Sequence, residues 1–344
     1  MAERNVRVVL RRVPEGKPQP GDLGLEEGEV PQPGPGQVLV RHRFLSLDPY
    51  MGSAIRGRHM SGGVPVGGLM PGETVGEVVA SNASHLPEGT MVLCRGGWQS
   101  FSVADAAPEG AVPEALSTRA WRLPDFDKVP ASYYLGCMGM PGLTAWAGTV
   151  TLTGPKPGET FLVSAATGAV GSTAGQIARI MGARVVGIAG SPEKCDFAVR
   201  ELGYAACVDY KQEGWEERLR EACPDGAHCY FDNVGGRTLE VAMQRLARGA
   251  RIVLVGMMEQ YSASGPLPGP NLAPLFVHRA EMRALVVYDH YPELATFRKR
   301  LAGWISDGRF TFREERVPGL AAAPEAFSRL MAGQTFGKVV VEVG

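Results

Sequence analysis

One stretch, residues 160–191, constrains the fold of this chain more than any other. It opens with a short apolar run at 161–163, passes through a turn of small residues, and ends in a β-branched run at 185–188. The residues between the turn and the second run have the apolar spacing of a helix. This order predicts a βαβ unit, whose helix N-terminus offers N–H groups and a positive dipole end to a pyrophosphate.

The turn, AATGAVG, contains two of the three glycines of a dinucleotide-binding fingerprint. Ala166 stands at the first position of G-x-G-x-x-G, and Gly168 and Gly171 fill the other two. The second glycine allows close approach of the backbone to phosphates, and the third allows the helix to pack on the strand. An ordinary turn of small residues is the alternative, but the flanking strand and helix favour the dinucleotide. We expect the pyrophosphate on Gly168, Ala169, Val170 and Gly171.

The end of the second predicted strand indicates which dinucleotide binds. NAD sites place an Asp or Glu about 20 residues after the glycines, where it binds the ribose hydroxyls. This chain has Gly190 and Ser191 there, with Lys194 soon after. A hydroxyl and an ammonium without a carboxylate favour the 2′-phosphate of NADPH. The alternative is that Lys194 only solvates the first turn of a helix over 192–202.

Length, charge and cysteine spacing limit the function classes. The chain of 344 residues is long enough for two domains, and its net charge of −1 gives no basis for binding nucleic acid or an anionic membrane. No apolar run is long enough to span a bilayer, and the first residues lack the apolar core of a secretory signal. The six cysteines form no C-x-x-C pair. We expect a cytoplasmic protein with reduced thiols and a small-molecule partner.

Two patterns of secondary structure divide the chain. Short β-branched runs broken by Pro and Gly, at 6–11, 37–44, 74–79, 90–94 and 99–103, predict a small, partly open β-barrel. Strands and helices then alternate, which predicts an α/β domain with a doubly wound parallel sheet of six strands. These strands are expected at 161–164, 184–189, 206–209, 229–232, 250–255 and 282–287. Because the sheet is complete without the last residues, we assign 1–128 with 309–344 to the first domain and 129–308 to the second.

Candidate ligand-binding residues follow the predicted strands. A doubly wound sheet binds its ligand at the carboxyl ends of its strands. Tyr210 follows the third strand, Asn233 the fourth, and residues 256–261 the fifth. We therefore expect these residues in one crevice.

Several motifs recur in a fixed order along nearly the whole chain. They are LSLDPYM at 45–51, GMPGLTAW at 139–146, AATGAVG at 165–171, FDNVGG at 231–236, a run ending in EQY at 259–261, and FGKVVVEV at 336–343. In these motifs the chain resembles the zinc-free medium-chain dehydrogenase/reductases. More narrowly, it is similar to the branch of leukotriene B4 dehydrogenases, prostaglandin reductases, alkenal double-bond reductases and bacterial curcumin reductases.

The resemblance implies a GroES-like barrel, a Rossmann domain, NADPH between them, and a homodimer formed through the Rossmann domains. The implied activity is reduction of a carbon–carbon double bond conjugated to a carbonyl. Besides the glycine-rich turn, the implied cofactor contacts are Gly190, Ser191, Lys194, Tyr210, Asn233, Val255, Gly256, Met257, Tyr261, Leu285, Val286, Val287 and Thr335.

The chain departs from the family pattern at two positions. Thr335 stands where Asn commonly precedes Phe-Gly-Lys, and Gly52 stands where Arg often follows Pro-Tyr-Met. A threonine lacks the paired donor and acceptor of an amide, which weakens the expected contact of Thr335 with the nicotinamide.

The implied chemistry uses no metal. The catalytic zinc of related alcohol dehydrogenases needs a thiolate and an imidazole, and residues 46–50 supply neither. Hydride transfer to the β-carbon of an enone leaves negative charge on the carbonyl oxygen, which a placed phenol can stabilise. Tyr261 is the first candidate for this donor and Tyr50 the second, while water or a tyrosine relay protonates the α-carbon. Asp48 is expected to cap its turn rather than act as a base.

Three functions stay open at this point. The first is reduction of α,β-unsaturated ketones or aldehydes. The second is reduction of quinones, which needs no specific proton donor, and the third is a non-catalytic NADPH-binding sensor or RNA-binding protein. The two tyrosines together with the cofactor contacts argue against the third.

Loops rich in Gly and Pro at 55–68 and 262–272 are expected to border the substrate pocket.

Overall fold

The structure is a computed structural model that describes residues 3–60, 62–261 and 268–344. The chain divides into two compact units, Met1–Gly136 with Glu314–Gly344, and Cys137–Arg313. The sequence places the corresponding boundaries at residues 128 and 308. Of the two loops expected to border the substrate pocket, residues 61 and 262–267 lie outside the described part of the chain.

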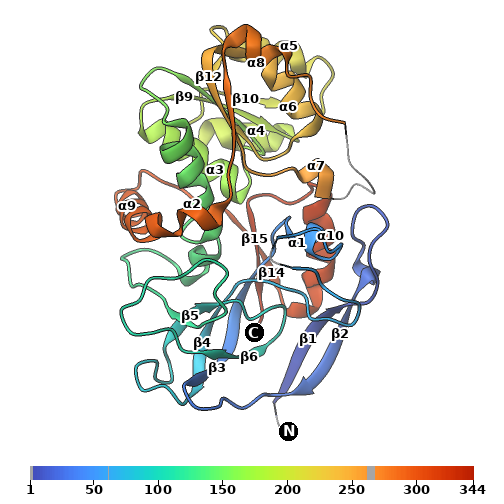
Figure 1. Cartoon of the computed structure of the whole chain (residues 1–344), viewed down its shortest axis with the longest axis vertical. Coiled ribbons are helices and arrows are strands. Elements are labelled where there is room, and N and C mark those ends of the chain that lie inside the picture. The colour runs from blue at the N-terminus through green and yellow to red at the C-terminus, as the bar shows by residue number, and fades with distance from the viewer. Residues whose placement is uncertain (1–2, 61, 262–267) are drawn as a thin grey trace. The chain divides into compact units, whose positions relative to one another are not determined.

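The second unit is built on a parallel six-stranded sheet (Figure 1). The strand order is β10-β9-β8-β11-β12-β13, and all neighbours pair in parallel. The strands are β8 (Thr160–Ser164), β9 (Arg184–Ala189), β10 (Ala206–Asp209), β11 (Ala227–Asp232), β12 (Leu246–Leu254) and β13 (Glu281–Ala284). The order reverses between β8 and β11, where a doubly wound sheet opens its ligand crevice. The predicted six-stranded doubly wound sheet is confirmed.

Helices connect these strands. They are α2 (Met140–Trp146), α3 (Ala169–Ile180), α4 (Pro192–Arg200), α5 (Trp215–Ala222), α6 (Gly236–Met243), α7 (Met258–Tyr261), α8 (Ala273–His278) and α9 (Leu294–Ser306), together with η3 (Ala147–Thr153) and η4 (Val287–Glu293). All five residues of β8 are buried, as expected for a strand covered on both faces. Three strand bounds differ from the prediction by two residues or more. Strand β11 begins at Ala227 rather than 229, β12 begins at Leu246 rather than 250, and β13 ends at Ala284, so that Val287 already begins η4.

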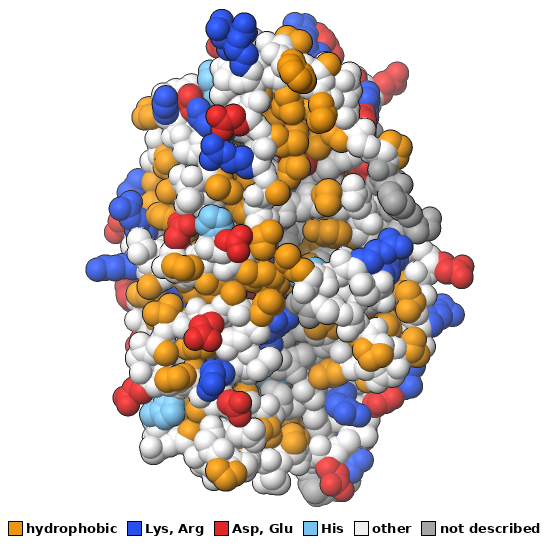
Figure 2. All heavy atoms as spheres, viewed as in Figure 1, with side chains coloured by type: hydrophobic (Ala, Val, Ile, Leu, Met, Phe, Trp, Pro, Cys, Tyr) orange, Lys and Arg blue, Asp and Glu red, His pale blue; other side chains and the backbone are white. Residues whose placement is uncertain are grey.

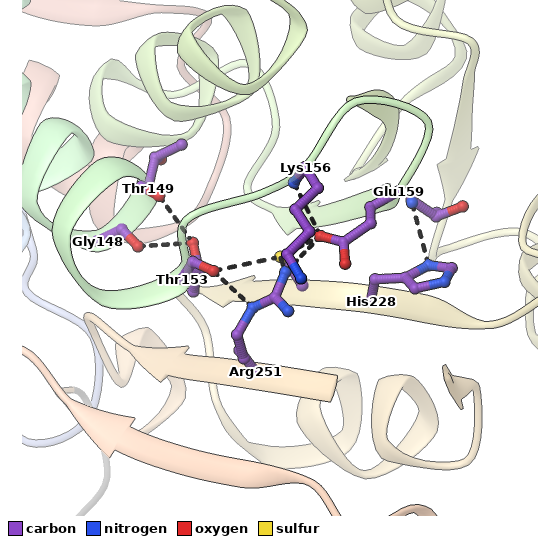
Figure 3. A network of polar contacts seen from close by, with 9 residues as sticks. Gly148, Thr149, Thr153, Lys156, Glu159, His228 and Arg251 are labelled. Carbon is purple, nitrogen blue, oxygen red and sulfur yellow. Dashed lines mark hydrogen bonds and ion pairs between the residues drawn. The ribbon is translucent and has the colours of Figure 1, made fainter. Parts of the chain in front are cut away.

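A polar network lies beside the first residues of β8 and β11 and the middle of β12 (Figure 3). The Arg251 side chain of β12 donates from Nε to the Thr153 carbonyl at 2.6 Å, pairs with Glu159, and lies 3.0 Å from Cys229 Sγ. Burial raises the pKa of Glu159, but hydrogen bonds from the Lys156 N–H and from Arg251 outweigh it and hold that pKa below its usual value. The network lies at the end of the sheet opposite to the ligand crevice.

The first unit contains a mixed seven-stranded sheet and a separate two-stranded sheet. Its strands are β1 (Arg4–Leu10), β2 (Leu23–Glu29), β3 (Gln37–Ser46), β4 (Thr74–Ser81), β5 (Met91–Cys94), β6 (Phe101–Asp105), β7 (Trp121–Arg122), β14 (Glu314–Pro318) and β15 (Lys338–Glu342). Its helices are η1 (Pro20–Asp22), α1 (Met51–Ala54), η2 (Ala131–Leu135), η5 (Leu320–Ala322) and α10 (Ala323–Met331).

Strand β3 is the centre of this sheet. It pairs antiparallel with β4, β6 and β15, so the sheet curls around it as in a partly open barrel. The pairing of β15 with β3, in which Val340 lies opposite Ser46, brings the C-terminal segment into the first unit.

Across the described residues, the structure contains no helix that is both long and apolar enough to span a bilayer.

Candidate cofactor and active site

The turn between β8 and α3 fits a pyrophosphate. Gly168 precedes the helix in an extended conformation (φ −75°, ψ 172°), and no side chain caps the helix. The Gly168 N–H donates to the Ala165 carbonyl at 2.9 Å, and Ala165 itself has a positive φ of 50°. Gly168, Ala169 and Val170 are half-buried. Because the first N–H groups of a helix lack partners within it, this uncapped end is suited to an anion.

Glycine is required at position 171. A Cβ there would overlap the Ala165 carbonyl oxygen and lie 3.1 Å from the Ser164 carbonyl oxygen, so the start of α3 lies directly against the end of β8. This close approach is the role that the sequence assigns to the third glycine of the fingerprint.

A buried tyrosine, absent from the predicted site, supports the same turn. Tyr204 is 3% exposed, and its hydroxyl donates to the Gly171 carbonyl at 3.1 Å. Its hydroxyl would overlap a Cβ at Gly175, which makes glycine necessary at that position of α3. Burial raises the pKa of Tyr204 well above its usual value, so the phenol stays protonated and keeps donating. Nothing in the sequence around Tyr204 distinguishes it from an ordinary core aromatic residue.

The end of β9 has the features expected for an adenosine 2′-phosphate. The two residues directly after the strand, Gly190 and Ser191, carry no carboxylate, and Ser191 caps α4 by accepting a hydrogen bond from the Lys194 N–H at 3.3 Å. Capping uses a lone pair of the Ser191 hydroxyl and leaves its proton for a ligand. A Cβ at Gly190 would lie 3.0 Å from the Tyr210 ring. Tyr210 is 42% exposed, and the Lys211 ammonium lies 5.9 Å from the centroid of its ring. An aromatic surface with nearby ammonium groups fits an adenosine phosphate.

A buried polar network underlies the ends of β8 and β11. The Asp232 carboxylate is fully buried and accepts hydrogen bonds from the Tyr230 hydroxyl at 2.7 Å, the Ser164 hydroxyl at 3.0 Å and the Gly235 N–H at 3.0 Å. The Asn233 amide donates to the Ser164 carbonyl at 2.7 Å. Burial raises the pKa of Asp232, although its hydrogen bonds oppose the shift. Asn233 is therefore fixed at the switch point of the sheet, between the two central strands.

Tyr261 lies beside Asn233. It ends the short helix α7, and its hydroxyl is 3.5 Å from the place of a Cβ on Gly256. The same Cβ would lie 3.0 Å from the Asn233 carbonyl oxygen. Burial raises the pKa of Tyr261, and a hydrogen bond with the Met257 backbone partly offsets that shift. The structure thus brings Asn233, Gly256, Met257 and Tyr261 together at the carboxyl ends of β11 and β12.

Glu259 connects this loop to the next helix. Its N–H donates to the Val234 carbonyl at 3.3 Å, and its carboxylate lies against Gly236, where a Cβ would overlap it. Burial raises the pKa of Glu259, and a hydrogen bond from the Arg237 N–H opposes this shift. The carboxylate thus caps α6, which has no cap from its own preceding residues. The role of Glu259 cannot be foreseen from its position in the EQY motif.

The remaining candidates of the second unit follow the last two strands. Val255 donates its N–H to the Asp232 carbonyl at 2.8 Å, and Leu285 donates to the Leu254 carbonyl at 2.9 Å. Val286 and Val287 are half-buried just beyond β13. All the candidates of this unit therefore lie at or beyond the carboxyl ends of its strands.

Tyr50 and Thr335 belong to the first unit. Tyr50 precedes α1 and is half-buried, with its ring centroid 4.7 Å from that of His59. Thr335 is 8% exposed in the segment before β15. Asp48 does not have the expected capping role: its carboxylate binds Lys338 Nζ at 2.6 Å and the Ser46 hydroxyl.

Within the described residues, no three His, Cys, Asp or Glu side chains are grouped so that they could hold a metal ion.

Comparison with known proteins gives matches along the whole chain. Residues 6–112 match a family model for the N-terminal domain of oxidoreductases, and residues 169–304 match one for zinc-binding dehydrogenases. The NADPH-dependent curcumin reductase of Escherichia coli (strain K12) is 39% identical, over 99% of this chain and 97% of that protein. The chain belongs to the zinc-free medium-chain dehydrogenase/reductases. The family predicted from the motifs is confirmed.

Two further members of this family show how far the likeness extends. Prostaglandin reductase 1 of Bos taurus is 38% identical over 95% of each chain. The crystal structure of CurA in complex with NADPH from Vibrio vulnificus has a TM-score of 0.90 and 37% identity, covering 98% of this chain and 99% of that one. The GroES-like and Rossmann architecture of the family is confirmed here, and the branch consists of NADP-dependent reductases.

Proposed function

We propose that this chain catalyses the NADPH-dependent reduction of the carbon–carbon double bond of α,β-unsaturated ketones and aldehydes. The observation that carries this proposal is its full-length similarity to an NADPH-dependent curcumin reductase and to prostaglandin reductase 1. The uncapped N-terminus of α3 and the end of β9 without a carboxylate fit NADPH. Residues 168–171 would hold the pyrophosphate, and Lys194 and Tyr210 the adenosine phosphate.

Bound NADPH supplies the hydride, and the protein supplies the groups that stabilise the developing charge. In this proposal the Tyr261 hydroxyl donates to the substrate carbonyl oxygen, which becomes negative as the β-carbon is reduced. Burial favours the protonated phenol at neutral pH, so Tyr261 is available as a donor. Tyr50 is the second candidate donor, and Thr335 is a candidate contact of the nicotinamide end.

The test is a screen of NADPH oxidation over short enals, cyclic enones, long-chain oxo-lipids, diarylheptanoids and quinones, with NADH in parallel. We expect turnover of enals or enones to products reduced at the double bond, with a preference for NADPH. Turnover of quinones without any enone would assign the chain to quinone reduction instead. Binding of NADPH without turnover of any class would support a sensor.

We also propose that two copies associate through the second unit. Strand β13 is the edge of its sheet, and the nearby residues Leu272, Phe276 and Val277 are 52%, 85% and 69% exposed. Figure 2 shows hydrophobic side chains gathered in the region where Figure 1 places α8. Exposed apolar surface beside an open sheet edge is typical of an interface.

A cytoplasmic location stays a prediction from the sequence.

A further inference from the structure

A buried ion pair joins two segments of the first unit that carry its expected site residues. Lys338 Nζ lies 2.6 Å from Asp48 Oδ1, and the two side chains are 2% and 10% exposed. The same ammonium donates to the Leu47 carbonyl at 2.8 Å, and the Ser46 hydroxyl bonds the other carboxylate oxygen. Asp48 immediately precedes the Pro49–Tyr50 turn, and Lys338 lies three residues after Thr335.

The ion pair lies where the hydrogen bonds of the sheet end. Strand β3 ends at Ser46, which pairs with Val340, and the Leu47 N–H still donates to the Val339 carbonyl at 3.3 Å. Beyond Leu47 the chain turns away, and Lys338 at the start of β15 binds the turn through its side chain. The Asp48 carbonyl then accepts the Met51 N–H at 3.1 Å, which begins α1.

The energetics of such a pair favour a role in geometry rather than in stability. Removing two charges from water costs free energy that their attraction only partly offsets, and apolar residues of similar volume are often as stabilising. The Asp48 carboxylate also accepts a hydrogen bond from the Ser46 hydroxyl, and the Lys338 ammonium also donates to the Leu47 carbonyl. These additional hydrogen bonds fix the orientation of both side chains. Loss of either partner alone would leave an unpaired buried charge.

We propose that Asp48 and Lys338 are positioning residues, whose ion pair sets the orientation of the turn at residues 48–50 and thereby places Tyr50 for the reaction. The role of Tyr50 rests on the proposed function, since it is the second candidate donor there. The Tyr50 ring also packs against that of His59, with the ring centroids 4.7 Å apart.

The decisive experiment separates stability from positioning. Lys338→Met alone should lower the melting temperature, because it leaves the Asp48 carboxylate unpaired. The double variant Asp48→Leu/Lys338→Met removes both charges at similar volume and should recover most of the stability. We expect its kcat for the best enone to stay about tenfold or more below that of the wild type, with the NADPH dissociation constant unchanged.

A partly exposed ion pair in the same sheet offers a matched control. Arg43 of β3 and Glu77 of β4 are 2.9 Å apart, with side chains 41% and 34% exposed. The double variant Arg43→Met/Glu77→Leu should change neither kcat nor the melting temperature appreciably. A stable Asp48→Leu/Lys338→Met protein with wild-type kcat would overturn the proposal.

Two further measurements keep the inference separate from the proposed function. Amide hydrogen exchange over residues 45–55 should be faster in the double variant, whatever the substrate; unchanged exchange would overturn the proposal. If the double variant does not fold, the Lys338→Arg variant is used in its place, because arginine keeps the positive charge but moves the hydrogen-bond donor. Its kcat and its amide hydrogen exchange over residues 45–55 are then measured in the same way. A wild-type protein inactive on every enone would refute the proposed function, while faster exchange in the variant would still support the positioning of the turn.

Discussion

At the end of β9, two small residues are expected to favour an adenosine 2′-phosphate over the free ribose hydroxyls of NAD. Gly190 leaves room for the Tyr210 ring, and Ser191 offers a hydroxyl where an NAD site has a carboxylate. The sequence alone is enough for this inference, because the type of one residue after a predicted strand carries it. It cannot show that Ser191 also caps α4, since capping depends on where the helix begins.

Lys194→Ala should weaken the binding of NADPH and leave that of NADH nearly unchanged. The ammonium is expected to bind the 2′-phosphate, which NADH lacks, so KM for NADPH should rise about tenfold. Steady-state kinetics with both cofactors give the ratio of kcat/KM values. Lys156→Ala, an exposed lysine before β8, is the control and should not change the ratio. Equal use of NADH by the wild type would contradict the NADPH preference.

Tyr261→Phe should lower kcat for enones by about 10²-fold, as expected for the loss of one donor to a developing oxyanion. The dissociation constant of NADPH, measured by fluorescence titration, should change little, because the ring remains in place. Gln260→Ala alters an exposed residue of the same helix and should leave kcat unchanged. Wild-type kinetics in Tyr261→Phe would remove this residue from the proposed mechanism.

Among the elements, the turn before α3 shows what a local motif can and cannot predict. The glycines at 168 and 171 indicate the turn because their spacing is short-range. Tyr204 comes after α4, and the packing of α4 against β9 and β10 places its hydroxyl at the Gly171 carbonyl. In the first unit, the sequence does not indicate β2, since Gly24, Gly28 and the acidic residues of this strand obscure the alternation. It does not indicate β7 either, because that strand has only two residues.

Tyr204→Phe should affect both stability and cofactor binding. Loss of its hydrogen bond to the Gly171 carbonyl should lower the free energy of unfolding by about 1 kcal/mol. The loosened turn should raise KM for NADPH several-fold. Tyr134→Phe is a matched control, because that buried hydroxyl donates to the Pro124 carbonyl at 2.6 Å in the first unit. It should lose similar stability without a change in KM, and an equal KM effect in both variants would contradict a role specific to the turn.

At the scale of the whole molecule, the two ends of the parallel sheet have different roles. The carboxyl ends carry the candidate cofactor residues, and the amino ends carry the Arg251–Glu159 network. The sequence predicts the position of the first end, because strand order and strand direction fix it. It does not indicate the second, because Thr153, Glu159, Cys229 and Arg251 come from four separate segments whose contacts depend on register.

Arg251→Met should lower stability and leave kcat unchanged. It removes one of the partners of the Glu159 carboxylate and of the Thr153 carbonyl, at a cost of about 1–3 kcal/mol. Because the folded pKa of Glu159 is depressed, the pair contributes stability above the unfolded pKa and loses it as pH falls through the folded one. Urea unfolding of both proteins should therefore show a difference near pH 7 that shrinks in acid. A difference that is constant with pH would contradict the ionic contribution.

The proposed dimer can be tested at its edge strand. The edge strand β13 carries Glu281 and Arg283, whose opposite charges make it self-complementary in an antiparallel pairing of two copies. Phe276 is 85% exposed beside it, so Phe276→Asp should break a dimer without unfolding the subunit. Light scattering with size exclusion should give about twice the chain mass of 36.7 kDa for the wild type and one chain mass for the variant. Val199→Asp changes an exposed residue of α4 and should remain dimeric, whereas a monomeric wild type would refute the proposed interface.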